Sequence, residues 1–333
     1  MIGPYWASSK RKMENMSLDT SEILKSNANS LRNLIVGMRS AFARGENVME
    51  YARTCLGQDS NTSVATLIAY DLQAGSYVRN ALENPGGRDL WCSQLAEILN
   101  PLVVEGSSLL EVGCGEATTL AGILQKLTHT PNALGFDISW SRCNYGLQWL
   151  SQKNVSANLF VADLFDIPLA DQSVDVVYTS HSLEPNGGRE EDAIAELLRV
   201  ARRAVVLIEP AYELSDEIAR ERMRAHGYVR NLRQVAEKLE GEVSEYRLLD
   251  YSINPKNPSG LLLLKKKNAH STELAPVSNI QWKCPLTSSP MTQGTSGFYS
   301  AETGIVYPVL SGIPLLRAEH AVVASAFEQN HSL

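Results

Sequence analysis

Two glycines separated by one residue follow a short apolar run in the first half of the chain. The segment reads Leu109-Leu110-Glu111-Val112-Gly113-Cys114-Gly115. Glycine in such a turn lets the backbone approach a ligand that any Cβ would exclude. Open α/β sheets bind ligands at the carboxyl ends of their strands, where this turn would lie. A nicotinamide-binding turn would carry a third glycine, as GxGxxG, but Thr118 stands at that place.

Three acidic residues stand at the ends of successive predicted strands, roughly 26 residues apart: Glu111, Asp137 and Asp163. An acid ahead of the glycine turn is a poor neighbour for a pyrophosphate but a good partner for an ammonium group. At the second strand end, a carboxylate can accept both hydroxyls of a ribose. At the third, it can accept an exocyclic adenine amine. Each acid taken alone could merely cap a helix, but their recurrence favours one nucleoside ligand.

The elements that must position these side chains lie between about Gly106 and Lys267. Short apolar runs predict strands at 108–112, 132–137, 157–162, 174–179, 204–208, 245–254 and 260–266. Helices are expected near 118–126, 139–152, 190–200 and 214–239. This alternation predicts a Rossmann-like, mostly parallel seven-stranded α/β sheet with helices on both faces. Only residues 255–259 separate the last two strands, so we expect a terminal antiparallel hairpin.

The composition is that of a globular protein. The chain has 333 residues, is 44% hydrophobic and 20% charged, and carries a net charge of −7, which weakens a role on nucleic acid. No apolar run is long enough to span a membrane. The first twelve residues lack a signal-peptide core, and the five scattered cysteines form no CxxC pair. We therefore expect a cytoplasmic protein without a disulfide framework or a metal site.

The region from about Gly106 to Lys267 resembles the class I S-adenosylmethionine-dependent methyltransferases. The resemblance rests on the turn from Glu111 to Gly115, on Asp137, on Asp163-Leu164 and on the strand that begins at Val174. It implies that Glu111, Gly113, Cys114 and Gly115 hold the methionine end of the cofactor. It further implies Asp137 and Ile138 on the ribose and Asp163 with Leu164 at the adenine. Ala117 departs from the pattern, because many members carry a third glycine there.

In such enzymes the segment after the fourth strand lies beside the transferred methyl group. Here it contains Ser180, which we expect at the cofactor, followed by His181 and Glu184, which are close enough in sequence to converge. A neutral imidazole near pH 7 can accept a proton, so the pair is a candidate general base. Alternatively, His181 packs over the methionine portion of the cofactor. Both interpretations remain open at this stage.

Residues after the fifth strand are expected to face the substrate. Tyr212 comes first, and a helical stretch with Arg220, Arg222, Arg224, His226 and Arg230 follows. Arginine binds carboxylates and phosphates bidentately, so Tyr212, Arg224 and His226 are candidate substrate contacts. The alternative is an ordinary solvated helix face.

The helical region before the sheet supplies a candidate lid. Many small-molecule methyltransferases carry an amino-terminal lid whose aromatic residues cover the cofactor and the substrate. Tyr70 and Tyr77 are candidates for the cofactor and Gln73 for the substrate. An aromatic stripe that serves only as helix core remains the alternative.

The carboxyl-terminal segment carries a second resemblance. Trp282-Lys283-Cys284-Pro285 and the run from Tyr307 to Pro314 are similar to the small zinc-ribbon-type domain of a methyltransferase activator. Thr287 stands where the CxxC partner of Cys284 would be, and one thiolate cannot build a structural zinc site. We therefore expect a metal-free module that docks on the methyltransferase domain or on a second subunit.

These observations divide the chain as follows. A flexible arm at 1–20 precedes a helical lid region at 21–105, the methyltransferase domain at 106–267, a linker at 268–279, the activator-like module at 280–325 and a tail at 326–333.

The leading hypothesis is a methyltransferase (EC 2.1.1) that binds S-adenosylmethionine and releases S-adenosylhomocysteine. It would methylate an oxygen, or else a nitrogen, of a small molecule without a metal. The net negative charge argues against nucleic acid, and no membrane partner is expected. A homodimer, or docking through the carboxyl-terminal module, would be compatible with the sequence. One alternative is an enzyme that acts on tRNA, rRNA or protein, and another is a non-catalytic scaffold that keeps the fold.

Overall fold

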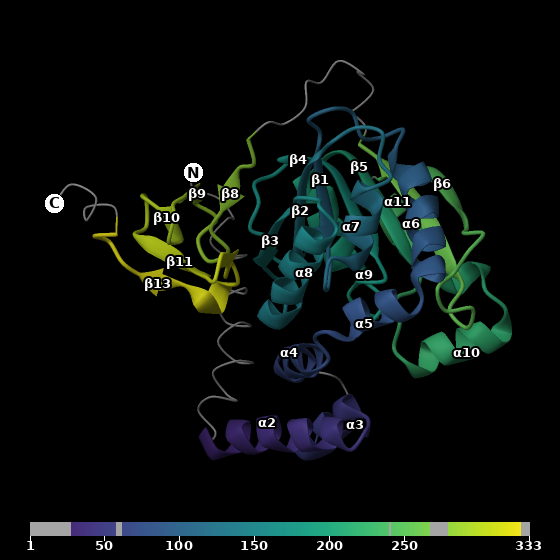
Figure 1. Ribbon diagram of the computed structural model, residues 1–333, viewed down its shortest axis with the longest axis horizontal. Helices are drawn as coiled ribbons and strands as arrows, with labels where there is room; N and C mark the ends of the chain where they lie inside the picture. Colours follow the sequence, from purple (N-terminus) through teal and green to yellow (C-terminus); the bar gives the residue numbers. More distant parts are fainter. Residues whose placement is uncertain (1–27, 58–61, 240, 267–278, 328–333) are drawn as a thin grey trace. The chain divides into compact units, whose positions relative to one another are not determined.

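The computed structural model describes residues 28–57, 62–239, 241–266 and 279–327, which form parts of two compact units, 1–74 and 75–333 (Figure 1). The predicted arm at 1–20 lies outside the described residues, as do nearly all of the predicted linker and tail. The unit boundary at Gly75 falls inside the region 21–105 that we expected to be one helical segment.

The described residues of the first unit form three helices: α2 (Ala28–Ala43), α3 (Val48–Leu56) and α4 (Ser63–Leu72). Asn47 caps α3, because its side chain accepts the backbone N–H groups of Met49 and Glu50. Apolar residues at helical spacing form a small core of Leu34, Met38, Val48, Ala52, Ala65 and Ala69. Tyr70 and Gln73, two of the candidate lid residues, lie on and just after α4.

The second unit is built on a seven-stranded sheet with the order β3-β2-β1-β4-β5-β7-β6. The strands are β1 (Ser108–Val112), β2 (Asn132–Asp137), β3 (Asn158–Val161), β4 (Val174–Ser180), β5 (Ala201–Pro210), β6 (Glu242–Leu248) and β7 (Ser259–Lys265). β1 to β5 pair in parallel, and β7 runs antiparallel to both β5 and β6. The prediction of a mostly parallel sheet with a terminal antiparallel hairpin is confirmed.

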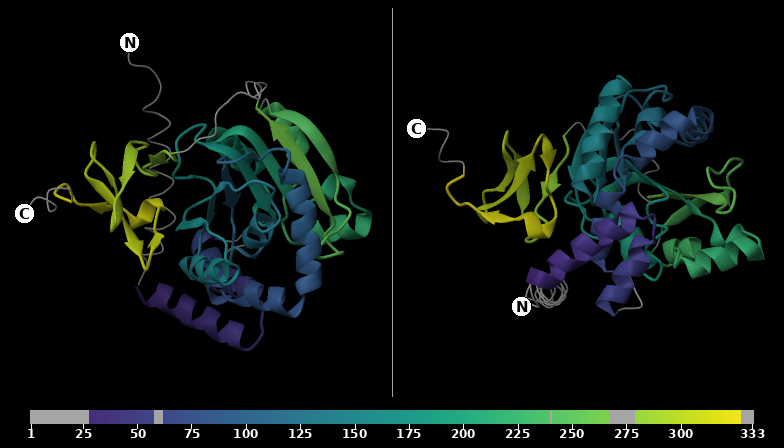
Figure 2. Two further views of the ribbon diagram at one scale, coloured as in Figure 1. Left: turned by 45° about the horizontal axis from the view of Figure 1, so that its top comes forward. Right: turned by 60° about the horizontal axis from the view of Figure 1, so that its bottom comes forward.

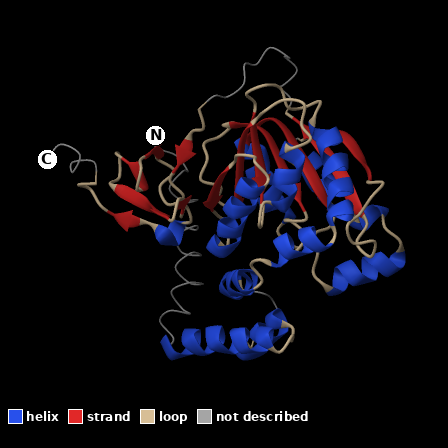
Figure 3. Ribbon diagram, in the orientation of Figure 1, coloured by secondary structure: helices blue, strands red, loops and turns tan. Residues whose placement is uncertain are grey.

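Helices flank this sheet (Figure 3). They are α5 (Ser76–Glu83), α6 (Pro85–Leu99), α7 (Thr118–Leu124), α8 (Trp140–Gln152), α9 (Glu190–Val200), α10 (Glu217–Ala225) and α11 (Leu232–Lys238). Every residue of central β1 is buried, whereas edge strand β6 is partly exposed along its length. The core contains two large clusters, one with Leu110 and Val177 and the other with Trp91 and Tyr178, and a small third cluster around Val161.

Two element predictions were wrong in detail. The helix expected over 214–239 is two helices, because Gly227 and Asn231 adopt left-handed φ angles of 67° and 57° that no α-helix contains. The sixth strand was expected at 245–254, but it ends at Leu248, and a loop follows before β7 begins at Ser259. In the described ranges, no helix has the length and apolarity required to cross a membrane.

A second, antiparallel sheet forms the carboxyl-terminal module, seen in two further views in Figure 2. Its strands are β8 (Trp282–Lys283), β9 (Pro290–Gln293), β10 (Gly297–Ser300), β11 (Ile305–Leu310), β12 (Ile313–Pro314) and β13 (Val322–Val323). Residues of the module also complete the core of the larger sheet, because Phe298, Tyr307 and Leu316 belong to the cluster that contains Phe160.

The module contacts the edge strand β3 and the loop that follows it. Leu315 forms a parallel β-bridge with Val161, and the Leu316 N–H donates to the Val161 carbonyl over 2.8 Å. On the other side of the loop, the Ala170 N–H donates to the Gln281 carbonyl over 2.8 Å. The module therefore holds the β3–β4 loop from two sides.

Candidate cofactor site and active site

The glycine turn after β1 needs its glycines for both conformation and space. Gly113 and Gly115 have φ angles of 67° and 55°. A Cβ on Gly113 would lie 2.4 Å from the Ser182 Cβ, and one on Gly115 would lie 3.2 Å from the Tyr77 ring. Ala117, at the usual third-glycine position, also has a positive φ of 52°. The departure from the glycine pattern therefore leaves the backbone in the conformation that glycine favours.

Glu111 is buried at the end of β1, with 2% of its surface exposed, and its Oε2 atom has no hydrogen-bond partner among the described residues. At and just after the end of β4, the hydroxyls of Tyr178, Thr179 and Ser182 are also buried and make no close hydrogen bond in the described structure, although those of Tyr178 and Thr179 interact with the carboxyls of Glu111 and Glu209. Burial raises the pKa of Glu111 to about 8. Buried polar atoms without partners are costly, so this group indicates a site that a polar ligand completes.

Asp137 lies at the end of β2 and is tied to the glycine turn. Its Oδ2 accepts the Gly115 N–H over 3.1 Å, and its Oδ1 accepts the Ser139 N–H over 2.9 Å. Burial raises the pKa of Asp137, against the opposing effect of the Arg142 charge. Each carboxylate oxygen has a further lone pair that can accept a ligand hydroxyl. Ile138 follows directly and is half-buried.

Asp163 and Leu164 begin the β3–β4 loop that the module holds. Asp163 Oδ1 accepts the Phe165 N–H over 2.9 Å, so its side chain shapes the loop, and its other oxygen remains available to a ligand. Leu164 is half-buried and packs against the larger core cluster. Cys114, by contrast, packs its side chain against Gly135 of β2.

Glu116 has a structural role that the sequence did not reveal. It is fully buried, and its two oxygens accept the N–H groups of Gly75 (2.8 Å) and Val78 (2.7 Å) at the start of α5. Gly75 offers no capping side chain, so Glu116 supplies the cap. The Tyr77 ring consequently lies against Gly115, with the Arg142 guanidinium 4.6 Å from its centroid.

The segment after β4 brings His181 and Glu184 together. The His181 Nδ1 lies 2.8 Å from Glu184 Oε2, and its Nε2 lies 2.7 Å from the Ser259 hydroxyl. Burial lowers the pKa of His181, but Glu184 and Glu209 outweigh burial, so the net pKa is raised. The order Ser–His–Glu is that of a hydrolase triad. Ser259 is fully buried, however, so it cannot attack an acyl substrate.

The arginines after β5 are largely engaged within the protein. Arg224 donates to Glu217 over 2.5 Å and to the Tyr212 hydroxyl over 2.9 Å. The guanidinium groups of Arg220 and Arg230 also lie within 6 Å of the Tyr212 ring. His226 is exposed and contacts Tyr228 edge to face. Tyr212 is thus the centre of a cationic cluster.

The remaining predicted residues are placed as follows. Ser180 is the last residue of β4 and is half-buried. Tyr70 and Gln73 belong to the first unit, so their part in a lid remains a prediction. In the segments that the structure describes, no three His, Cys, Asp or Glu residues gather as a metal site would require.

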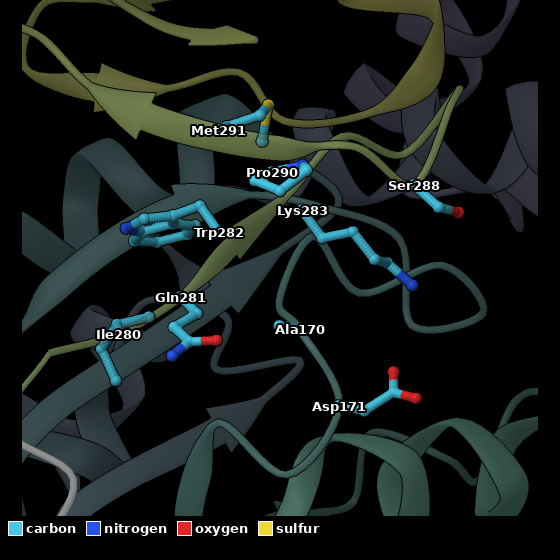
Figure 4. A pocket seen from close by; sticks show the side chains of 9 residues that line it. All are labelled: Ala170, Asp171, Ile280, Gln281, Trp282, Lys283, Ser288, Pro290 and Met291. Atoms are coloured by element: carbon cyan, nitrogen blue, oxygen red, sulfur yellow. The ribbon is translucent and has the colours of Figure 1, made fainter. Parts of the chain in front are cut away.

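A separate cavity of about 440 Å³ opens where β8 of the module meets the end of the β3–β4 loop (Figure 4). Lys283, Trp282 and Asp171 contribute to its lining. None of the residues of the glycine turn or of the three strand-end acids lines it. It is therefore distinct from the candidate cofactor site.

Comparison with known proteins gives one match to a family model and several similar solved structures. Residues 109–204 match the model of a methyltransferase domain, and no curated protein sequence matches the chain. Similar structures include an S-adenosylmethionine-dependent methyltransferase from Aquifex aeolicus (16% identity, 57% of this chain and 97% of that one, TM-score 0.44). Another is magnesium protoporphyrin IX methyltransferase from Synechocystis with bound S-adenosylhomocysteine (13% identity, 60% of this chain and 99% of that one, TM-score 0.49). A third is the complex of a methyltransferase activator of Haloferax volcanii with a candidate methyltransferase (16% identity, 59% of this chain and 96% of that one, TM-score 0.46).

Proposed function

We propose that this protein is an S-adenosylmethionine-dependent methyltransferase whose acceptor is an oxygen, or else a nitrogen, of a small molecule. One observation carries the proposal: the buried Glu111 carboxyl, whose Oε2 makes no hydrogen bond within the described residues, stands beside a glycine turn, with Asp137 at the end of the next strand and Asp163 just beyond the end of the following one. The matched methyltransferase domain contains all three acids.

These residues fit the proposed cofactor. Glu111 and the turn from Gly113 to Gly115 would hold the amino acid end, and Asp137 with Ile138 would hold the ribose. Asp163 and Leu164 would meet the adenine, while Ser180 and Tyr77 would border the site. The bound cofactor would supply an electrophilic methyl group, and the protein would contribute alignment and exclusion of water.

The contacts of His181 favour an orienting part over a general base. Both ring nitrogens already have partners within the protein, so the ring is held by Glu184 and Ser259 and presents no free nitrogen to an acceptor. Glu184 would then orient the imidazole. Tyr212, Arg224 and His226 remain candidates for acceptor contacts, and their cationic cluster would suit an anionic acceptor.

The test has two stages. Isothermal titration with S-adenosylmethionine, S-adenosylhomocysteine and NADH should show binding of the first two alone. Turnover of pooled metabolites to S-adenosylhomocysteine should then identify the acceptor. Glu111→Gln should weaken S-adenosylmethionine binding by at least about tenfold, since a charged hydrogen bond contributes about 1.5–3 kcal/mol. Absence of S-adenosylmethionine binding by the wild type would refute the proposal.

For the carboxyl-terminal module we propose docking in cis on the methyltransferase domain, in the manner of a fused activator. The support is the β-bridge between Leu315 and Val161 and the shared core around Phe160. Stoichiometric zinc in the purified protein would contradict the metal-free character that we propose for this module.

A further inference from the structure

The loop after β4 leaves the strand in an unusual conformation. His181 has a φ of 57°, in the left-handed region that residues other than glycine rarely adopt. Its N–H donates to the Ile208 carbonyl of β5 over 2.9 Å. The next residue, Ser182, consequently lies against Gly113 of the glycine turn. A specific interaction must hold this conformation, because such a backbone costs about 1–3 kcal/mol.

The Glu209 side chain provides that interaction. Three consecutive backbone N–H groups, those of Ser182, Leu183 and Glu184, donate to its carboxylate, each over 3.1 Å. Consecutive N–H groups in such a loop form an anion-binding concavity. Here the acceptor is a carboxyl group of the protein itself, and only 2% of Glu209 is exposed.

The side chains of the loop are fixed to the same end of the sheet. The His181 ring is held between Glu184 and Ser259, and Ser259 pairs with Pro210, the neighbour of Glu209, in the β5–β7 ladder. The tips of β5 and β7 thus hold the loop through its backbone and its imidazole. Neither Glu209 nor Ser259 contacts the glycine turn in the described hydrogen bonds.

We propose that Glu209 is a positioning residue for the cofactor site: its carboxylate fixes the loop 181–184, so that Ser182 lies on the Gly113 turn where the methionine end of the cofactor would bind. This inference rests on the proposed function. Glu209 acts through the loop backbone and does not itself touch the cofactor.

Glu209→Gln tests this part of the structure. The amide retains one acceptor oxygen but turns an N–H₂ donor toward at least one of the three backbone donors. Hydrogen exchange on the intact, cofactor-free protein should show lost protection of the amides at 182–184. Titration should show S-adenosylmethionine binding weakened by at least about tenfold, because misplaced positioning groups are costly.

A matched control and a milder variant complete the experiment. Asp175→Asn also removes a buried carboxylate that accepts a backbone N–H, but at the opposite end of β4. This variant should have lower thermal stability. Its folded fraction should bind S-adenosylmethionine with the affinity of the wild type. Glu209→Asp keeps the carboxyl group but retracts it by one methylene, and should give intermediate exchange and affinity.

The outcomes separate the two proposals. A wild type that does not bind S-adenosylmethionine would refute the proposed function, while the exchange result would still decide whether Glu209 holds the loop. A wild type that binds, with a Glu209→Gln variant of equal affinity or equal amide protection, would overturn the positioning part. If Glu209→Gln does not fold, a Glu209→Asp variant identical to the wild type would overturn it.

Discussion

The imidazole of His181 and the hydroxyl of Ser259 lie 2.7 Å apart, although 78 residues separate them in the chain. The contact joins the loop after β4 to the first residue of β7. It fixes one ring nitrogen while Glu184 fixes the other, so the ring has a single orientation. This geometry gives a direct test of the state of His181.

Ser259→Ala should leave the His181 Nε2 without its partner and destabilise the protein by about 1–2 kcal/mol. Nitrogen chemical shifts of the His181 ring should change, whereas those of exposed His226 should not. Urea unfolding and histidine-selective NMR check this prediction. Unchanged His181 shifts would show that the hydroxyl does not fix the ring.

Binding of S-adenosylmethionine should release protons near pH 7. Burial raises the pKa of Glu111 to about 8, so without the cofactor this carboxyl is mostly protonated at pH 7. A ligand ammonium beside the carboxyl favours its ionised form and lowers that pKa. Calorimetric titrations in buffers of different ionisation enthalpy should show this release. Glu111→Gln should abolish most of it, and equal proton release by this variant would assign the proton to another group.

The cofactor-free protein should lose stability as pH rises from about 5 to 8. Burial raises the pKa of Glu209 from 4.5 to about 7 and that of Glu111 to about 8, so the folded state binds more protons than the unfolded chain across this interval. The raised pKa of His181 acts in the same direction: its stabilising contribution is complete below about 6.5 and is lost as pH rises through the folded value. Each group contributes up to about 1.4 kcal/mol per pH unit.

Urea unfolding at pH 5.5, 7 and 8.5 measures this dependence. The Glu111→Gln variant should show a shallower decline than the wild type, because it lacks one of the titrating groups. A decline of the same slope in both proteins would remove Glu111 from the explanation.

Glu116→Gln should loosen the start of α5. Its amide can accept one of the two N–H groups of Gly75 and Val78 but opposes the other. We expect faster hydrogen exchange at 75–80 and a loss of about 1–3 kcal/mol of stability. Glu97→Gln, which changes an exposed acid on α6, is the control and should behave as the wild type. Unchanged exchange in the Glu116 variant would refute the capping assignment.

Trp282→Ala should destabilise the second unit as a whole. The Trp282 ring packs edge to face against two other rings. The distance between ring centroids is 5.2 Å to Phe160 of β3 and 4.8 Å to Phe298 of the module. Truncation of a large packed aromatic costs about 3–5 kcal/mol when fully buried, and less for this half-buried side chain. Val323→Ala on an exposed strand is the control. Two separate unfolding transitions in the wild type would show that the module and the sheet fold independently.

The sequence predicted well the residues whose position depends on their neighbours in the chain. It did not predict contacts between residues that lie far apart in the chain. The length of the apolar runs predicted the three strands that have Glu111, Asp137 and Asp163 at or just beyond their ends, because a strand of this kind depends on a few adjacent residues. The contacts of Glu116 and Glu209 were not predictable, since their partners lie 41 and about 26 residues away in loops. Nor did helical period reveal the break at Gly227, whose positive φ interrupts an otherwise amphipathic stretch. Partners of buried carboxylates are set by the tertiary fold.

The bridge between Leu315 and Val161 also has a consequence for biosynthesis. Until residues 313–316 have left the ribosome, the outer side of β3 has no neighbouring strand, and its free N–H and C=O groups could pair with another chain. The nascent protein therefore passes through an interval in which its main sheet has formed but one border is uncovered. Conditions that slow translation of this region should increase the demand for chaperones.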